Sequence, residues 1–419
     1  MTSKGERVND RNHLIGLLLG TEEDWPSAFE GLMRRLDPHL LLGSETHSFD
    51  LERITIEPFN LRAVPRHSLV IDRLSHWYFV PREWLKKAAI MNDVYLMNNP
   101  FTFQAMEKHT AYCALMRLGL RVPETWLIPH KTPPENPRFP YTAERYNRPF
   151  RLEDVAHEIG YPLYMKPFDG GAWVGVTRVE DDHDLHRHYD ESGRRLMHLQ
   201  DSIEDFDVFA RSLSIGAETM VMHFDPSKPL HERYQVDHEF LTPGLGNEVL
   251  TISRLVNAFF HWECNSCEIL CKDGIAFPID YANACPDISL ISLHYYFPWA
   301  ITTLAKWAIY CCATSRRMQI DQEIRPYFDI GDRRDLSYEE KLSRYRSLAD
   351  AYFELDRYQE FCSTHLANID EVMLGFVESR DFDDLLVDTV RSTFPPHERE
   401  RFVAHYRGLL GAWATNRRA

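Results

Sequence analysis

Residues 161–176 read Tyr-Pro-Leu-Tyr-Met-Lys-Pro-Phe-Asp-Gly-Gly-Ala-Trp-Val-Gly-Val. The pattern predicts a strand that ends beside Lys166, a glycine-containing loop, and a second strand over residues 173–179. A lysine at a strand end can contact phosphate as a point charge. Gly170 and Gly171 have no Cβ, so backbone N–H groups can approach phosphate oxygens there. On these residues alone, an exposed lysine beside an ordinary hairpin turn stays open as the alternative.

A second stretch, residues 267–283, reads Cys-Glu-Ile-Leu-Cys-Lys-Asp-Gly-Ile-Ala-Phe-Pro-Ile-Asp-Tyr-Ala-Asn. Two apolar arms around a Lys-Asp-Gly turn predict a hairpin. Pairing about Asp273 makes Asp280 a diagonal neighbour of Glu268 on one face, within about 7–8 Å at Cβ. Asn283 follows where the second strand ends. Two carboxylates and an amide oxygen suit Mg²⁺, whereas a solvated hairpin is the alternative.

These two segments, in this order, resemble those of the ATP-grasp superfamily. The resemblance is to the carboxylate–amine ligase type, which has an ATP-binding domain similar to that of glutathione synthetase. It extends over roughly residues 98–290. The chain departs from the family at the last metal motif, which is usually E-x-N. Here Asp280-Tyr-Ala-Asn283 contains one more residue.

The resemblance implies a role for each matching residue. Arg211 would face the γ-phosphate or an acyl-phosphate, and the strand over 199–203 would hold adenine through its backbone. Asp205 or Asp207 stands where an acid commonly binds ribose. The residues expected to bind ATP are Lys108, Lys166, Gly170, Gly171, Gln200, Asp201, Ile203 and Asp207. The expected metal ligands are Glu268, Asp280 and Asn283, and the expected catalytic residues are Arg211, Lys166 and Arg254.

Arg254 is a candidate because of its position in the sequence and not because of the resemblance. It lies on a helix predicted over about 252–262, just before the hairpin. From there its side chain either faces the substrate or forms a structural salt bridge. Both interpretations stay open at the level of the sequence.

The resemblance also implies a reaction. Mg-ATP would phosphorylate a carboxylate, and an amine would attack the acyl-phosphate to give an amide or peptide bond, ADP and phosphate. The expected partners are a small-molecule carboxylate and amine, with an amino acid or peptide among them. Two alternatives remain: an ATP-grasp small-molecule kinase, which would want a more basic pocket, and a non-catalytic nucleotide-binding protein.

The predicted fold class is α/β (α+β), an ATP-grasp fold with an N-terminal α/β domain and a helical C-terminal extension. We expect a pre-ATP-grasp domain over residues 1–98 and a small lobe over 99–203. A large lobe with the metal site would cover 204–325, and a helical region 326–419. Residues 130–150, rich in Pro, Asn, Arg and Tyr, predict a loop or insertion within the small lobe.

Composition limits the remaining possibilities. The chain has 419 residues, with 47 basic and 63 acidic side chains and a net charge of −16. An acidic protein is not expected to be a general nucleic-acid binder, and no apolar stretch approaches the roughly 20 residues of a membrane span. The eight cysteines predict reduced thiols in a cytoplasmic enzyme. Their spacing from Cys264 to Cys271 fits a metal cluster poorly. The sequence allows a homodimer.

Overall fold

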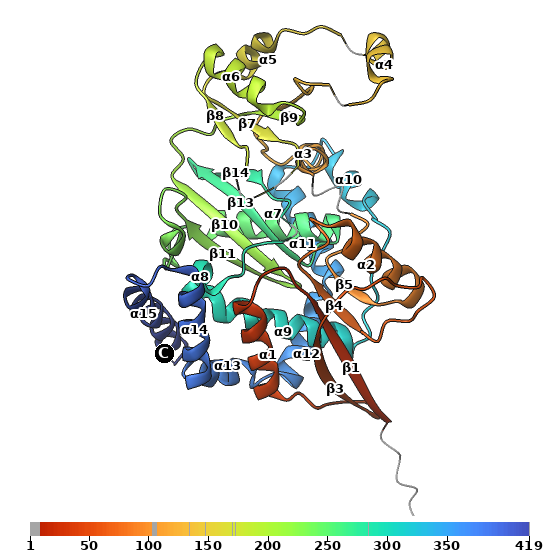
Figure 1. The fold of residues 1–419 in the computed structure, drawn as a ribbon, viewed down its shortest axis with the longest axis vertical. Coiled ribbons are helices and arrows are strands. Elements are labelled where there is room, and N and C mark those ends of the chain that lie inside the picture. The colour runs from red at the N-terminus through yellow and green to blue at the C-terminus, as the bar shows by residue number, and fades with distance from the viewer. Residues whose placement is uncertain are drawn as a thin grey trace, which may run out of the picture.

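The computed structural model describes residues 9–102, 107–133, 135–146, 148–169, 171, 173–283 and 285–418. Three sheets, stacked along the long axis of the molecule, organise the chain (Figure 1). The N-terminal sheet has the order β2-β3-β1-β4-β5, with only the β2–β3 pair antiparallel. Its strands are β1 (Asn9–Leu18), β2 (Leu40–Leu42), β3 (Glu45–Arg53), β4 (Leu69–Asp72) and β5 (Tyr95–Met97).

Two helices cover opposite faces of this sheet, because successive strand residues point to opposite sides. Leu17 and Ile71 join the core that includes α1 (Asp24–Leu36), whereas Leu18 and Val70 join the core of α2 (Phe79–Asn92). Strands and helices alternate along this part of the chain, in the order β1, α1, β2 to β4, α2 and β5. The predicted α/β character of the N-terminal region is therefore confirmed.

The small-lobe sheet is antiparallel, with the order β6-β9-β7-β8. Its apolar side chains Leu163, Met165 and Leu199 pack beneath two helices. The opposite face therefore carries the alternate residues, including Lys166 and Gln200. The strands are β6 (Thr125–Ile128), β7 (Leu163–Pro167), β8 (Thr177–Val179) and β9 (Met197–Asp201), and the helices are α5 (Leu152–Ile159) and α6 (Asp182–Ser192).

The large-lobe sheet is also antiparallel, with the order β12-β11-β10-β13-β14. Helix α7 (Pro243–Phe260) covers one face, where Ser253 Oγ lies 2.7 Å from Ser212 Oγ of β10. A Cβ on Gly216, which has φ +55°, would lie 2.1 Å from the Trp307 ring of α9 (Phe297–Ala313), so the close approach of the β10–β11 turn to this helix requires glycine. The strands are β10 (Val208–Ile215), β11 (Glu218–Phe224), β12 (Tyr234–Gln235), β13 (Cys264–Lys272) and β14 (Ile275–Asp280).

The C-terminal region is helical, as predicted. Its helices are α10 (Arg325–Gly331), α11 (Tyr338–Tyr352), α12 (Leu355–His365), α13 (Ile369–Val377), α14 (Arg380–Thr393) and α15 (Arg399–Arg418). Helix α11 packs against α7, and α13 and α14 pack against α1, so this region buttresses the large lobe and the N-terminal unit (Figure 1). Among the described residues, no helix has the length and apolarity to cross a membrane.

Two local predictions were wrong. The strand expected over 173–179 is β8 alone, because a turn precedes it, with Trp173 at φ +62° and Gly175 at φ +78°. The loop or insertion expected over 130–150 is not a plain loop, because it contains a short helix, α4 (Phe139–Tyr146). Between β5 and β6 the chain forms helix α3 (Lys108–Arg117).

Candidate functional site

The small lobe supplies two buried lysines. Lys166 lies on β7, and its Nζ donates a hydrogen bond of 2.6 Å to Gln200 Oε1 on β9. The same Nζ lies 3.5 Å from the backbone oxygen of Ile279 in the large lobe. Lys108 is the first residue of α3, and its Nζ forms an ion pair with Asp280. Both lysines therefore point at the edge of the large lobe that carries β14.

The large lobe contributes a row of charged side chains that faces these lysines. Register places Arg211 of β10 opposite Glu268 of β13, and Glu268 opposite Asp280 of β14. Arg211 Nη1 lies 3.6 Å from Glu268 Oε1. The row lies on the face opposite α7, because the neighbouring residue Ser212 contacts that helix.

The predicted geometry of the acid pair was wrong in one respect. A β-bulge between Glu268 and Ile269 shifts the register, so that Asp280 lies directly opposite Glu268 rather than diagonally. Without the bulge, the register of Ile269 with Pro278 would continue to Glu268 with Ile279, and Asp280 would point to the other face. A directly opposite pair has Cβ atoms about 4.5–5.5 Å apart. The bulge thus brings the two carboxylates to a spacing that one divalent cation can bridge.

Asn283 lies beside this pair. Its Nδ2 donates a hydrogen bond of 3.0 Å to Ser266 Oγ, and its backbone N–H donates one of 2.7 Å to Asn265 Oδ1. Ser266 and Glu268 are two residues apart on β13 and share a face. The extra residue of the Asp280-Tyr-Ala-Asn283 motif is therefore accommodated after β14 ends, and Asn283 still reaches the face of the two acids.

Burial controls the charges of both lobes. Burial is the main cause that lowers the pKa of Lys166 to about 8; Asp280 opposes the shift and the positive charge of Lys108 reinforces it. Burial raises the pKa of Glu268, an effect that Arg211 opposes and Asp280 reinforces. A buried acid beside a half-buried one favours a bound cation, and two buried lysines beside each other favour a bound anion.

Arg211 packs against two aromatic rings, but one of its hydrogen-bond donors has no partner among the described residues. Its guanidinium carbon lies 5.0 Å from the centroid of the Phe224 ring and 5.8 Å from that of Tyr234. Its Nε is buried and has no hydrogen-bond partner among the described residues. An unpartnered buried donor is costly, so this one is available to an anionic group placed between the lobes.

Other predicted ATP contacts lie around this centre. Gly170 falls outside the described residues, and Gly171 has no atom within 4 Å of the position a Cβ would take. Asp201 ends β9, and burial raises its pKa. Ile203 packs against the main core.

Asp207 makes a contact away from this centre. It is exposed, and its carboxylate accepts a hydrogen bond of 2.8 Å from the backbone N–H of Asp273, in the turn between β13 and β14. The structure thus places Asp207 at the tip of the hairpin and does not bring it to the row of Arg211, Glu268 and Asp280. Its predicted role in ribose binding gains no support from this placement.

Arg254 is not part of the site. It lies on α7, and its Nη2 forms an ion pair of 2.7 Å with Asp350 of α11. The large-lobe sheet separates α7 from the face that carries Arg211 and Glu268. Of the two interpretations left open by the sequence, the structure therefore shows the salt bridge, and we withdraw Arg254 from the catalytic candidates.

Two buried side chains of the site were missed in the sequence. His198 lies on β9 opposite Lys166, and its Nδ1 has no hydrogen-bond partner among the described residues. Tyr112 of α3 donates a hydrogen bond of 3.1 Å from its hydroxyl to Ile279 O. The strand alternation that links residues 198 and 200 could have revealed His198, whereas the contact of Tyr112 depends on how the lobes meet.

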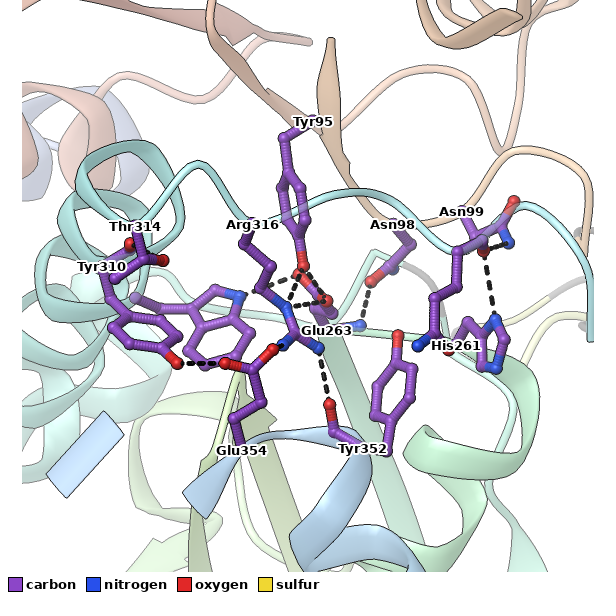
Figure 2. A network of polar contacts seen from close by, with 12 residues as sticks. Tyr95, Asn98, Asn99, His261, Glu263, Tyr310, Thr314, Arg316, Tyr352 and Glu354 are labelled. Atoms are coloured by element: carbon purple, nitrogen blue, oxygen red, sulfur yellow. Dashed lines mark hydrogen bonds and ion pairs between the residues drawn. The ribbon is translucent and has the colours of Figure 1, made fainter. Parts of the chain in front are cut away.

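A second buried polar cluster lies at the start of β13, before the acid pair (Figure 2). Glu263 accepts hydrogen bonds from Tyr95 Oη of β5 and, at 2.8 Å, from Trp307 Nε1 of α9. Arg316, which follows α9, lies 4.0 Å from Glu263 Oε1. This cluster ties the N-terminal sheet, the large lobe and the helical region to the strand that carries Glu268.

Comparison with known proteins supports the predicted fold class: the chain has the ATP-grasp fold. The structure of D-alanyl-alanine synthetase A from Vibrio cholerae O1 biovar eltor str. N16961 is similar at a TM-score of 0.50 and 10% identity, over 73% of this chain and 98% of that one.

Two further structures are similar at lower scores. They are a D-alanine–D-alanine ligase from Bacillus anthracis complexed with ATP (TM-score 0.49, 13% identity, 73% and 98% of the two chains) and a RimK domain protein ATP-grasp from Sphaerobacter thermophilus DSM 20745 (0.47, 14%, 70% and 98%). No family model and no curated protein sequence matches the chain.

Cysteine and histidine clusters contribute no further site. The eight cysteines are free, and within the described part of the chain no group of three or more His, Cys, Asp or Glu side chains is arranged to hold a metal ion. Glu268 and Asp280 would therefore hold a cation as a pair, completed by the Asn283 amide and by oxygens of a bound substrate.

Proposed function

We propose that the chain is an ATP-dependent carboxylate–amine ligase, which forms an amide or peptide bond and releases ADP and phosphate. The proposal rests on the row of Arg211, Glu268 and Asp280. Two buried lysines, Lys108 and Lys166, face this row. The similar structures include ligases that join amino acids, by their own descriptions. We infer a cytoplasmic enzyme with a small carboxylate and a small amine as substrates.

The residues fit a metal–nucleotide complex. Glu268, Asp280 and Asn283 would hold Mg²⁺ through oxygen, while Lys108 and Lys166 would hold the phosphates of ATP. Bound Mg²⁺ neutralises charge on the phosphates during phosphoryl transfer. Pairing of Lys108 with Asp280 keeps both charges compensated when no nucleotide is bound.

Arg211 acts on the other substrate. Phe224 and Tyr234 fix its guanidinium, and its unpartnered Nε can donate to the carboxylate that is phosphorylated or to the acyl-phosphate. A fixed donor stabilises developing negative charge without the reorganisation that water would need. Attack by the amine then breaks the bond between the acyl carbon and the phosphate oxygen, and phosphate leaves.

The test is an assay of the purified chain with ATP, Mg²⁺ and pools of amino acids and short peptides. A ligase releases ADP and free phosphate only when both the carboxylate and the amine are present. Hydroxylamine traps its acyl-phosphate as a hydroxamate. A kinase gives ADP and a phosphorylated product without free phosphate. Glu268→Gln should abolish release, and Glu239→Gln, at an exposed acid of the same lobe, should not.

A further inference from the structure

Residues 129–151 form an arm that leaves the small lobe after β6 and returns at α5. Its helix α4 stands apart from the rest of the lobe at the top of the molecule (Figure 1). None of the described side chains from 131 to 150 is buried, and Tyr141 is 73% exposed. Near its start the arm is attached by a hydrogen bond of 2.8 Å from Thr132 N–H to Gly193 O. The Tyr141 ring of this helix therefore packs little against the rest of the fold.

The charge of the arm is opposite to that of the whole chain. Residues 129–151 contain five basic and two acidic side chains, a net charge of +3 in a protein of net charge −16. Lys131 pairs with Asp190, and Arg151 lies 3.8 Å from Asp154. Three arginines form no ion pair with any residue that the structure describes: Arg138, Arg145 and Arg148. These guanidiniums are thus free to bind carboxylates, which they match with paired donors.

A hollow lies where the arm rejoins the lobe, between the edge strand β6 and α5. Its volume is about 490 Å³, within the range of ligand sites. Trp126, Phe150 and Val155 give it an apolar lining, and Asp154 and Glu158 stand among the residues that line it. The indole Nε1 of Trp126 is enclosed and has no acceptor among the described residues. A ligand that brings an apolar group and a carbonyl oxygen would satisfy both features.

We propose that this arm and hollow bind an acidic polypeptide segment that carries one apolar anchor residue. Glutamate or aspartate side chains of the segment would pair with Arg138, Arg145 and Arg148, and the anchor would fill the hollow beside Trp126. A backbone carbonyl next to the anchor would accept the indole N–H. The two acids that line the hollow disfavour negative charge at the anchor itself, so the acidic side chains of the segment would lie toward the three arginines.

The proposal is independent of the ligase reaction, because the hollow lies on the helix-covered side of the small-lobe sheet. Trp126 pairs with Leu199, which faces α5, whereas the neighbouring Thr125 pairs with Gln200 on the face of the two lysines. A segment bound at the arm would therefore leave the nucleotide site free.

The experiment titrates the full chain into a fluorescein-labelled peptide in which glutamates flank one central leucine, with anisotropy as the readout. We expect saturable binding that weakens at high salt, because the contacts are exposed charges. Combined Arg138→Glu, Arg145→Glu and Arg148→Glu should weaken binding about tenfold or more. The control Arg34→Glu, Arg62→Glu and Arg334→Glu changes the net charge equally at exposed sites elsewhere and should keep the affinity.

A second comparison tests the hollow. A peptide with serine in place of the leucine should bind the unaltered chain more weakly than the leucine peptide does. Val155→Gln makes the lining polar without adding charge, so it should weaken binding of the leucine peptide and leave binding of the serine peptide unchanged. Circular dichroism confirms that each variant is folded. Absence of peptide binding, an equal loss in the control triple variant, or tighter binding of a single-stranded oligonucleotide than of the peptide would each overturn the proposal.

Discussion

Two buried clusters of acids and bases lie on either side of the start of β13, and they differ in how fully their groups are satisfied. Arg316 donates 2.9 Å to Tyr95 Oη, 2.7 Å to Glu354 and 2.6 Å to a backbone carbonyl. At the candidate site, Arg211 approaches Glu268 only to 3.6 Å and leaves its Nε unpartnered. The first cluster is complete within the protein, and the second is not.

The difference separates stability from binding. A buried charge that is fully hydrogen-bonded contributes to a defined packing, and removal of one partner leaves the other uncompensated. A buried charge with spare donors keeps part of its desolvation cost until a ligand arrives. The Arg316 cluster should therefore govern unfolding, and the Arg211–Glu268 row should govern turnover.

The largest effect is expected at the acid pair. Glu268→Gln should lower the rate of ADP release by about 10²–10³-fold, because it removes one metal ligand and its charge. The free energy of unfolding should change by less than about 1 kcal/mol, because burial already raises the pKa of Glu268 and the amide removes that penalty. Steady-state kinetics and urea unfolding measure the two quantities. A fully active variant would remove Glu268 from the proposed metal site.

In the Arg316 cluster, a substitution is expected to change stability and to leave activity unchanged. Arg316→Met should lower the free energy of unfolding by about 3 kcal/mol, because Glu263 and Glu354 lose their buried partner. Activity per folded molecule should stay near that of the unaltered chain. Arg333→Met, which breaks an exposed pair with Asp335, should change stability by less than about 1 kcal/mol. If the two variants unfold alike, the Arg316 cluster is not the structural one.

The pH dependence of nucleotide binding follows from Lys166. Its pKa of about 8 means that the nucleotide-free chain loses this proton as pH rises above 8, while phosphate binding favours the charged amine. The affinity for ATP should therefore fall above pH 8, by up to about tenfold per pH unit, with uptake of a proton on binding. Calorimetry in two buffers of different ionisation enthalpy measures that uptake. Lys166→Arg should bind ATP without it, and the same uptake in this variant would assign the proton elsewhere.

The smallest effect concerns Arg254. Arg254→Met should lower the free energy of unfolding by about 1 kcal/mol, because Asp350 is left partly buried without its partner. The ratio kcat/KM should change by less than about twofold. The double variant Arg254→Met and Asp350→Leu should recover stability. A large fall in kcat/KM with an unchanged KM would return Arg254 to the catalytic residues.

Much of the site could be predicted because its signals are local. Strand alternation placed Lys166 on one face of β7, and the Lys-Asp-Gly turn fixed the hairpin that carries Glu268 and Asp280. These two inferences depend on residues that are neighbours in the chain, where propensity and periodicity act. Arg211 was expected only because its strand resembles one of the ATP-grasp superfamily.

Other features could not be predicted because distant contacts decide them. The bulge after Glu268 and the ion pair of Arg254 with α11 each depend on a partner that periodicity does not identify. The contact of Asp207 with the turn of the hairpin likewise depends on a partner far away in the chain, whereas its role in ribose binding stays a prediction from the resemblance.

The sequence by itself determined most kinds of element in this protein and the strands that carry Lys166, Glu268 and Asp280, since turn chemistry and side-chain alternation are local. Only the tertiary structure decided which charges meet across the lobes, which are satisfied within the fold, and which are left for a ligand. The physical reason is that burial and hydrogen-bond pairing depend on packing between segments far apart in the chain.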